Sequence, residues 1–83
     1  MKFIAEIDVM PLKALLDPQG KAVSHGLNNI GLSQIENVRI GKHITLEIDA
    51  DTQETAKAKV DEACRKLLSN PIMESYHFEL NQQ

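Results

Sequence analysis

The fold is decided by the stretch KFIAEIDVM at residues 2–10. Apolar and polar side chains alternate along most of it, and a period of two residues is typical of a β-strand that buries one face. Pro11 has no backbone N–H to donate to a neighbouring strand, so we expect the strand to end there. Its buried face must pack against a second layer, which the rest of the chain is predicted to supply.

A helix is predicted next. Asp17 is a favourable N-cap, Pro18 fits the first turn, and Gly31 is expected to stop the helix. Gly26 inside the helix costs about 1 kcal/mol relative to Ala, and we expect a close approach to a neighbouring backbone to offset this cost. The full set of later elements is a helix over residues 18–29, strands over 36–41 and 43–49 joined by a hairpin at Gly41-Lys42, a helix from Asp51-Thr52 to Asn70-Pro71, and a strand over 73–80.

The order of these elements, β-α-β-β-α-β, predicts an α+β fold of the ferredoxin-like type. Right-handed crossovers would place both helices on one face of a four-stranded antiparallel sheet, and residues 1–83 would form one domain. The second helix is expected to bury Ala56, Val60, Ala63 and Leu67.

The helix-free face of the sheet is predicted to be polar and mostly acidic. We therefore expect self-association through strand edges or loops and not through this face. Its predicted residues are Glu6, Asp8, Arg39, His43, Thr45, Glu47, Asp49, Ser75, His77 and Glu79.

The composition argues against several classes of partner. A formal net charge of −3 is unlike a nucleic-acid-binding protein, which needs clustered Lys and Arg. Phe3, Tyr76 and Phe78 are predicted to face the helices, where they cannot stack on bases. We expect neither a signal peptide nor a membrane span, which needs roughly 20 apolar residues. A single cysteine suits the reducing cytoplasm, where we expect the protein to work.

The reactive side chains do not form a recognisable catalytic or metal-binding set. The lone thiol of Cys64 is expected to pack beside the apolar face of the second helix. His25, His43 and His77 are not spaced as metal ligands, and the paired carboxylates of a wet sheet face are expected to be solvated. We therefore expect no catalytic residue, cofactor site or metal site in this chain.

Two segments are only partly explained by the fold. Gly20 is not required by a helix start, and Arg39 and Lys42 are expected to be exposed cations beside a tight turn. Such cations are suited to bind a phosphate or a partner's carboxylate. The residues alone leave open whether these segments have a specific role or only a structural one.

These segments resemble the PurS family, the small subunits of multi-subunit phosphoribosylformylglycinamidine synthase. The resemblance rests on LDPQGKA at residues 16–22, VRIGK at residues 38–42 and LLSNPIME at residues 67–74, in that order. It covers essentially the whole chain. The first two motifs are specific in combination, although each alone is weak.

The resemblance implies a non-catalytic subunit of a ligase in purine biosynthesis. Such a complex converts formylglycinamide ribonucleotide, ATP and glutamine into formylglycinamidine ribonucleotide, ADP, phosphate and glutamate. A PurQ-type glutaminase releases ammonia, and a PurL-type synthetase binds ATP and Mg²⁺. The small subunit, as a homodimer or tetramer, is expected to bridge the two and to support ammonia transfer.

On this basis a set of residues in the first two motifs is predicted to contact partner subunits without a catalytic role. Replacing Arg39 by Ala is expected to leave the isolated fold intact and to weaken assembly. The alternative is a ligand-sensing regulatory module of the same topology, which would bind a small molecule as a free protein. The predicted interface residues are Asp17, Gln19, Gly20, Arg39, Gly41 and Lys42.

Overall fold

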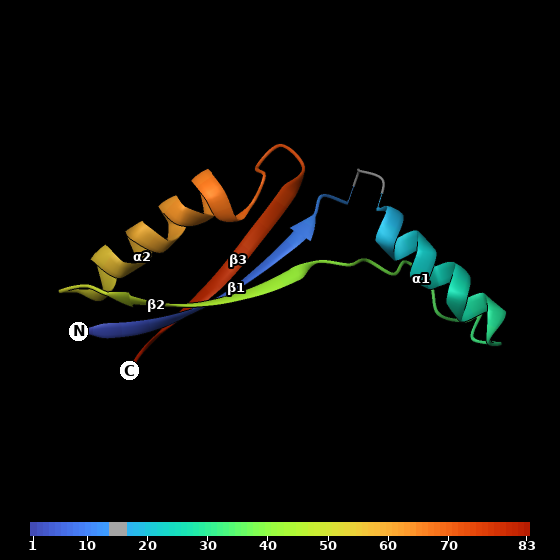
Figure 1. Ribbon diagram of the computed structural model, residues 1–83, viewed down its shortest axis with the longest axis horizontal. Helices are drawn as coiled ribbons and strands as arrows, with labels where there is room; N and C mark the ends of the chain where they lie inside the picture. Colours follow the sequence, from blue (N-terminus) through green and yellow to red (C-terminus); the bar gives the residue numbers. More distant parts are fainter. Residues whose placement is uncertain (14–16) are drawn as a thin grey trace.

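A computed structural model describes residues 1–13 and 17–83 of the chain (Figure 1). Residues 14–16, which fall between the first predicted strand and the first predicted helix and include Leu16 of the first motif, lie outside the described part. The predicted α+β class is confirmed. The elements are the strands β1 (Lys2–Pro11), β2 (Lys42–Asp49) and β3 (Glu74–Gln82), the helices α1 (Pro18–Asn29) and α2 (Gln53–Ala63), and the π-helical turn η1 (Cys64–Leu68).

β1 is the central strand of a three-stranded antiparallel sheet in the order β2-β1-β3 (Figure 1). The register pairs Ile7 with Ile44 of β2 and with Phe78 of β3, so apolar side chains of all three strands share one face. This face packs against α2 and η1, which contribute Val60 and Cys64 to the core. The alternation predicted for the first strand is confirmed by its buried residues, Phe3, Ala5, Ile7 and Val9.

The prediction of a fourth strand is wrong, because residues 36–41 form no strand. The predicted hairpin is wrong for the same reason, since β2 begins at Lys42 and pairs with β1. We call residues 32–41 the return segment, because they lead from the end of α1 back to the sheet. The Ile40 N–H donates to Asp17, and Arg39 donates to the Pro11 carbonyl oxygen. These contacts fasten the end of the segment to the start of α1 and to the end of β1, and the segment lies beyond the sheet (Figure 1).

The prediction that both helices cover one face of the sheet is also wrong. Figure 1 shows α1 beyond the end of the sheet, beside the return segment. The chain measures 52 × 26 × 14 Å, and its radius of gyration of 16.4 Å exceeds the value of about 12 Å for a compact domain of this length. One helix alone leaves much of the sheet half-covered. The partly buried residues are Ile44, Leu46, Ile48, Tyr76, Phe78 and Leu80.

Both ends of α1 are set by the local sequence, as predicted. Asp17 is the N-cap, and its Oδ1 accepts a hydrogen bond from the Gly20 N–H at 3.0 Å. At the other end Gly31 has a φ of 84°, and the Leu32 N–H donates to the Leu27 carbonyl oxygen at 2.9 Å. This is a Schellman motif, in which glycine adopts the left-handed conformation without steric cost.

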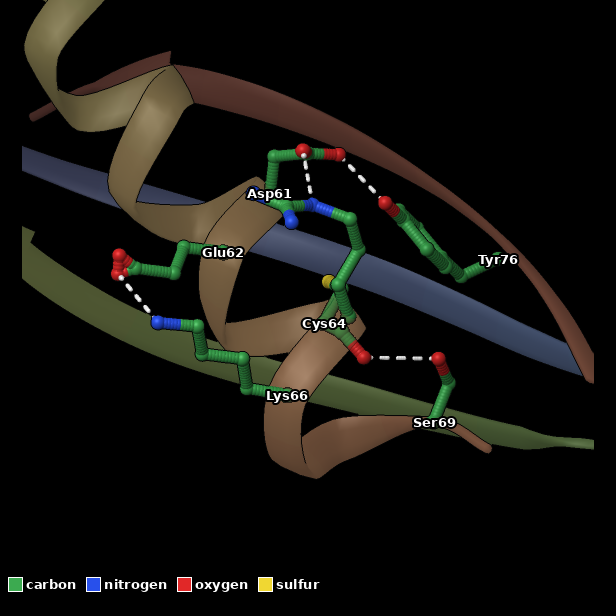
Figure 2. A network of polar contacts seen from close by, with 7 residues as sticks. Asp61, Glu62, Cys64, Lys66, Ser69 and Tyr76 are labelled. Carbon is green, nitrogen blue, oxygen red and sulfur yellow. Dashed lines mark hydrogen bonds and ion pairs between the residues drawn. The ribbon is translucent and has the colours of Figure 1, made fainter. Parts of the chain in front are cut away.

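η1 shifts the apolar face of α2 by one residue. The Ser69 Oγ donates to the Cys64 carbonyl oxygen at 2.7 Å (Figure 2), and the Ser69 N–H donates to the same oxygen at 3.0 Å. A bond from residue i to i−5 defines a π-helical turn, which holds one more residue than an α-helical turn. Leu67 is consequently 82% exposed, and Leu68 packs against the core in its place. The prediction of a buried Leu67 is wrong because it assumed an unbroken α-helical period.

The sheet face opposite α2 is polar, as predicted. His43 of β2 lies opposite Asp8 of β1, with Nδ1 2.6 Å from Oδ1, and its Nε2 lies 3.9 Å from Glu6. His77 of β3 pairs with the same Asp8 from the other side. Arg39 is not on this face, because it precedes β2.

Within residues 1–13 and 17–83, no three His, Cys, Asp or Glu side chains are grouped to hold a metal ion. The helices in this part of the chain are too short or too polar to span a membrane.

Candidate functional site

The predicted interface residues lie at or next to one junction, where α1, the end of β1 and the return segment meet. Asp17 connects these parts, because Oδ1 accepts from the Gly20 N–H and Oδ2 accepts from the Ile40 N–H at 2.9 Å. The bonds from Gly20 and then Ile40 lower the pKa of the Asp17 carboxyl group. One ionised side chain thus caps α1 and fastens the helix to the return segment.

Gly20 and Gly41 allow backbone segments to approach closely at this junction. A Cβ atom on Gly20 would lie 2.7 Å from Asp17 Oδ2 and closer still to the Val38 carbonyl oxygen. A Cβ atom on Gly41 would overlap the Val9 carbonyl oxygen. This close approach explains why position 20 is a glycine, which the start of a helix alone does not require.

The remaining members of the predicted interface divide into buried and exposed side chains. Arg39 is half-buried and donates to the Pro11 carbonyl oxygen, which joins the return segment to the end of β1. Its expected place as an exposed cation is therefore wrong. Gln19 and Lys42 are exposed. Contact of these residues with a partner stays a prediction.

α1 carries an apolar stripe that the described part of the chain leaves uncovered. Val23 and Ile30 are exposed, Ile30 by 70%, and Leu27 between them is half-buried. Leu32 and Ile35 of the return segment are exposed as well. The sequence pattern identified this stripe but assigned it to the core, because an amphipathic helix normally turns its apolar side to its own domain.

Polar side chains of α2, η1 and β3 form a hydrogen-bonded network that stabilises the fold. The Tyr76 hydroxyl donates to Asp61 Oδ1 at 2.5 Å, and Arg65 Nε donates to Oδ2 at 2.9 Å (Figure 2). These bonds lower the pKa of Asp61, the one from Tyr76 most. Burial raises the pKa of the Cys64 thiol, which keeps it protonated and unreactive. The packing role predicted for Cys64 is confirmed, because its side chain is fully buried.

Comparison with known families places nearly the whole chain in one of them. Residues 4–82 match the family model of PurS, described as phosphoribosylformylglycinamidine (FGAM) synthase. The chain belongs to the PurS family. The PurS subunit of Synechocystis sp. is 42% identical over 67 residues, which cover 81% of this chain and 67% of that protein. The PurS subunit of Bacillus subtilis is 37% identical over 70 residues, which cover 84% and 82%.

Solved PurS structures share the fold. A chain in the structure of PurLQS from Thermotoga maritima superposes with a TM-score of 0.88 at 32% identity, covering 96% of this chain and 98% of its own. Bacillus subtilis PurS in a C2 crystal form superposes with a TM-score of 0.86 at 34% identity, covering 96% of this chain and 99% of its own. The resemblance based on the three motifs is confirmed, and with it the role as a PurS subunit of FGAM synthase. The ligand-sensing alternative is not favoured.

Proposed function

We propose that this chain is a non-catalytic assembly subunit of FGAM synthase, which joins a PurL-type synthetase to a PurQ-type glutaminase and supports ammonia transfer between them. The observation that carries the proposal is the uncovered apolar surface of an elongated chain. The Thermotoga maritima neighbour belongs to a structure of PurLQS, which supports association with both kinds of subunit.

The apolar stripe of α1 supplies the driving force for association. Fully burying one Val, Leu or Ile side chain stabilises a contact by about 1.5–3 kcal/mol. Val23, Ile30, Leu32 and Ile35 are all exposed in the single chain. A second copy that covers this stripe would give a homodimer or tetramer, and the half-covered sheet offers it a further apolar surface.

We assign the chemistry of the complex to its other subunits. ATP and Mg²⁺ would bind to the synthetase, and this chain would hold neither. The polar groups of the junction support this assignment, because Asp17 and Arg39 are engaged in holding α1 to the rest of the chain. Gln19 and Lys42, which are exposed beside the junction, would contact a partner directly. The complex would work in the cytoplasm.

The proposal is tested by reconstitution with tagged synthetase and glutaminase subunits. Replacing Ile30 by Asp introduces a charge into the apolar stripe, whereas Asn28→Asp adds the same charge on the opposite side of α1. We expect Ile30→Asp to lower the mass of the free oligomer and to reduce capture of the partners. Glutamine-dependent activity of the complex should fall, and activity supplied with free ammonia should not. Asn28→Asp should retain both the oligomer and the capture of partners.

Light scattering and co-purification provide the decisive readouts. A parent chain that is monomeric at assay concentration and captures neither subunit would contradict the proposal. Equal loss in the Ile30 and Asn28 variants would show that added charge, and not the apolar stripe, is responsible.

A further inference from the structure

A shallow groove lies between α1 and the return segment, apart from the apolar stripe. Its volume is about 460 Å³, and it is open to solvent. The described residues that line it are Lys21, Ser24, His25, Asn28, Asn37 and Val38.

The groove is lined by hydrogen-bond donors. Lys21, Ser24, His25 and Asn28 follow the i, i+3, i+4, i+7 pattern, so they form one stripe along α1. Each of these side chains is able to donate, and Lys21 adds a positive charge. None of the described lining residues is an acid, although the whole chain has a net charge of −3. Within residues 1–13 and 17–83, Lys21 forms no ion pair that would neutralise it.

The opposite wall of the groove is fixed in place by the junction. Asn37 has a φ of 57°, a left-handed conformation that asparagine adopts more readily than most residues other than glycine. The next residue, Val38, lies against Gly20 through its carbonyl oxygen, and Ile40 is bonded to Asp17. The two walls are thus joined at one end before any ligand binds.

The groove and the apolar stripe occupy opposite sides of α1. The centre of the stripe formed by Val23, Leu27 and the C-cap residue Ile30 lies about 140° around the helix axis from the centre of the donor stripe. A second copy seated on the apolar stripe would therefore leave Lys21 and His25 open to solvent.

We propose that this groove binds the phosphate group of a small phosphorylated metabolite. A cation with neighbouring hydrogen-bond donors matches the three acceptor oxygens of a phosphate. An acidic segment of a partner protein fits less well, because protein interfaces have an apolar centre and Val38 is the only apolar side chain among the described lining residues. This site is separate from the apolar stripe proposed for assembly.

The test is an NMR titration of the uniformly ¹⁵N-labelled full chain. Inorganic phosphate, ribose 5-phosphate and AMP are added in turn, with succinate at matched ionic strength as the carboxylate probe. We expect saturating shifts of the amide signals of α1 and of Asn37 with the phosphorylated probes, and weaker shifts with succinate. Lys21→Gln should weaken phosphate binding about tenfold, the loss expected for one charge-assisted bond. Lys57→Gln, which removes an exposed lysine of α2, should not.

Three results would overturn the proposal. Non-saturating shifts spread over all lysines would indicate unspecific screening, and equal shifts with succinate would assign the groove to carboxylates. If Lys21→Gln and Lys57→Gln weakened phosphate binding equally, the groove would not be the phosphate site. Capture of the synthetase and glutaminase subunits by Lys21→Gln is measured in parallel, and its retention separates this site from the assembly role.

Discussion

Replacing Gly20 by Ala tests whether the junction is as tightly packed as the structure indicates. Gly26→Ala in the same helix is the matched control, because a Cβ atom there would meet nothing within 4 Å. The expected close approach of a backbone to Gly26 is therefore wrong, and this glycine is free to be replaced. Both variants gain helix propensity of about 1 kcal/mol, so their difference isolates the packing at Gly20.

The magnitude follows from the atoms around Gly20. A new Cβ atom would lie 2.7 Å from Asp17 Oδ2 and closer to the Val38 carbonyl oxygen, so backbone must move by about 1 Å to restore ordinary contact. Overpacking of this kind costs about 1–3 kcal/mol. The same movement would stretch the 2.9 Å bond from Ile40 to Asp17, and a bond to a charged group contributes about 1.5–3 kcal/mol. We expect Gly20→Ala to be about 2–4 kcal/mol less stable than Gly26→Ala.

Urea unfolding at one fixed protomer concentration measures this difference, because the stability of an oligomer depends on concentration. Hydrogen exchange of the α1 amides shows whether the loss is local to this helix. If the two alanine variants have equal midpoints and equal amide protection, the close approach of Val38 to Gly20 is not a constraint, and the reasoning fails.

Three further predictions concern the sheet and α2. The hydrogen bond to Asp8 raises the pKa of His43. The stability that this bond contributes is therefore complete below the unfolded pKa of about 6.5 and is lost as the pH rises through the folded pKa. His43→Gln should remove this part of the pH dependence of the urea midpoint. Leu68→Ala should destabilise the protein by about 1–3 kcal/mol and Leu67→Ala by less than about 0.5 kcal/mol, and the reverse order would contradict the π-helical turn. Tyr76→Phe should leave Asp61 with one donor fewer and raise its pKa, which NMR titration of the carboxyl group would detect.

The sequence was sufficient for those elements whose signals are local. The alternation around Ile7, the cap at Asp17 and the stop at Gly31 depend on neighbours within a few residues, and all three are confirmed. Cys64 was also placed correctly, because a lone thiol on an apolar helix face is normally buried.

The failures concern interactions between distant residues. Val38 and Ile40 alternate like a strand, but their segment does not join the sheet, and the Ile40 N–H is bonded instead to Asp17, 23 residues away in sequence. The position of α1 is also not encoded in its own amphipathic pattern. Such a pattern predicts that the apolar face of a helix is buried, but it does not identify the surface that buries it. Leu67 was misplaced because a π-helical turn has no periodic signature of its own.

The candidate site was predicted in part. The two motifs that contain Asp17, Gly20, Arg39 and Gly41 were selected for residues that a helix start and a hairpin did not explain. The structure brings these motifs together at one junction. The groove next to them was missed, because Lys21 and Asn37 become neighbours only once the return segment lies along α1.

Because α1 lies beyond the sheet, it acts as a strut. The direction in which its side chains face around the helix axis matters as much as its length. Its 12 residues span about 18 Å. One inserted residue would lengthen it by only about 1.5 Å but would rotate everything beyond the insertion by about 100°, so the two parts of the apolar stripe would no longer lie on one side of the helix. An insertion of seven residues would lengthen the strut by about 10 Å and nearly restore that direction. Length variation in this helix should therefore be tolerated in whole pairs of turns and not in single residues.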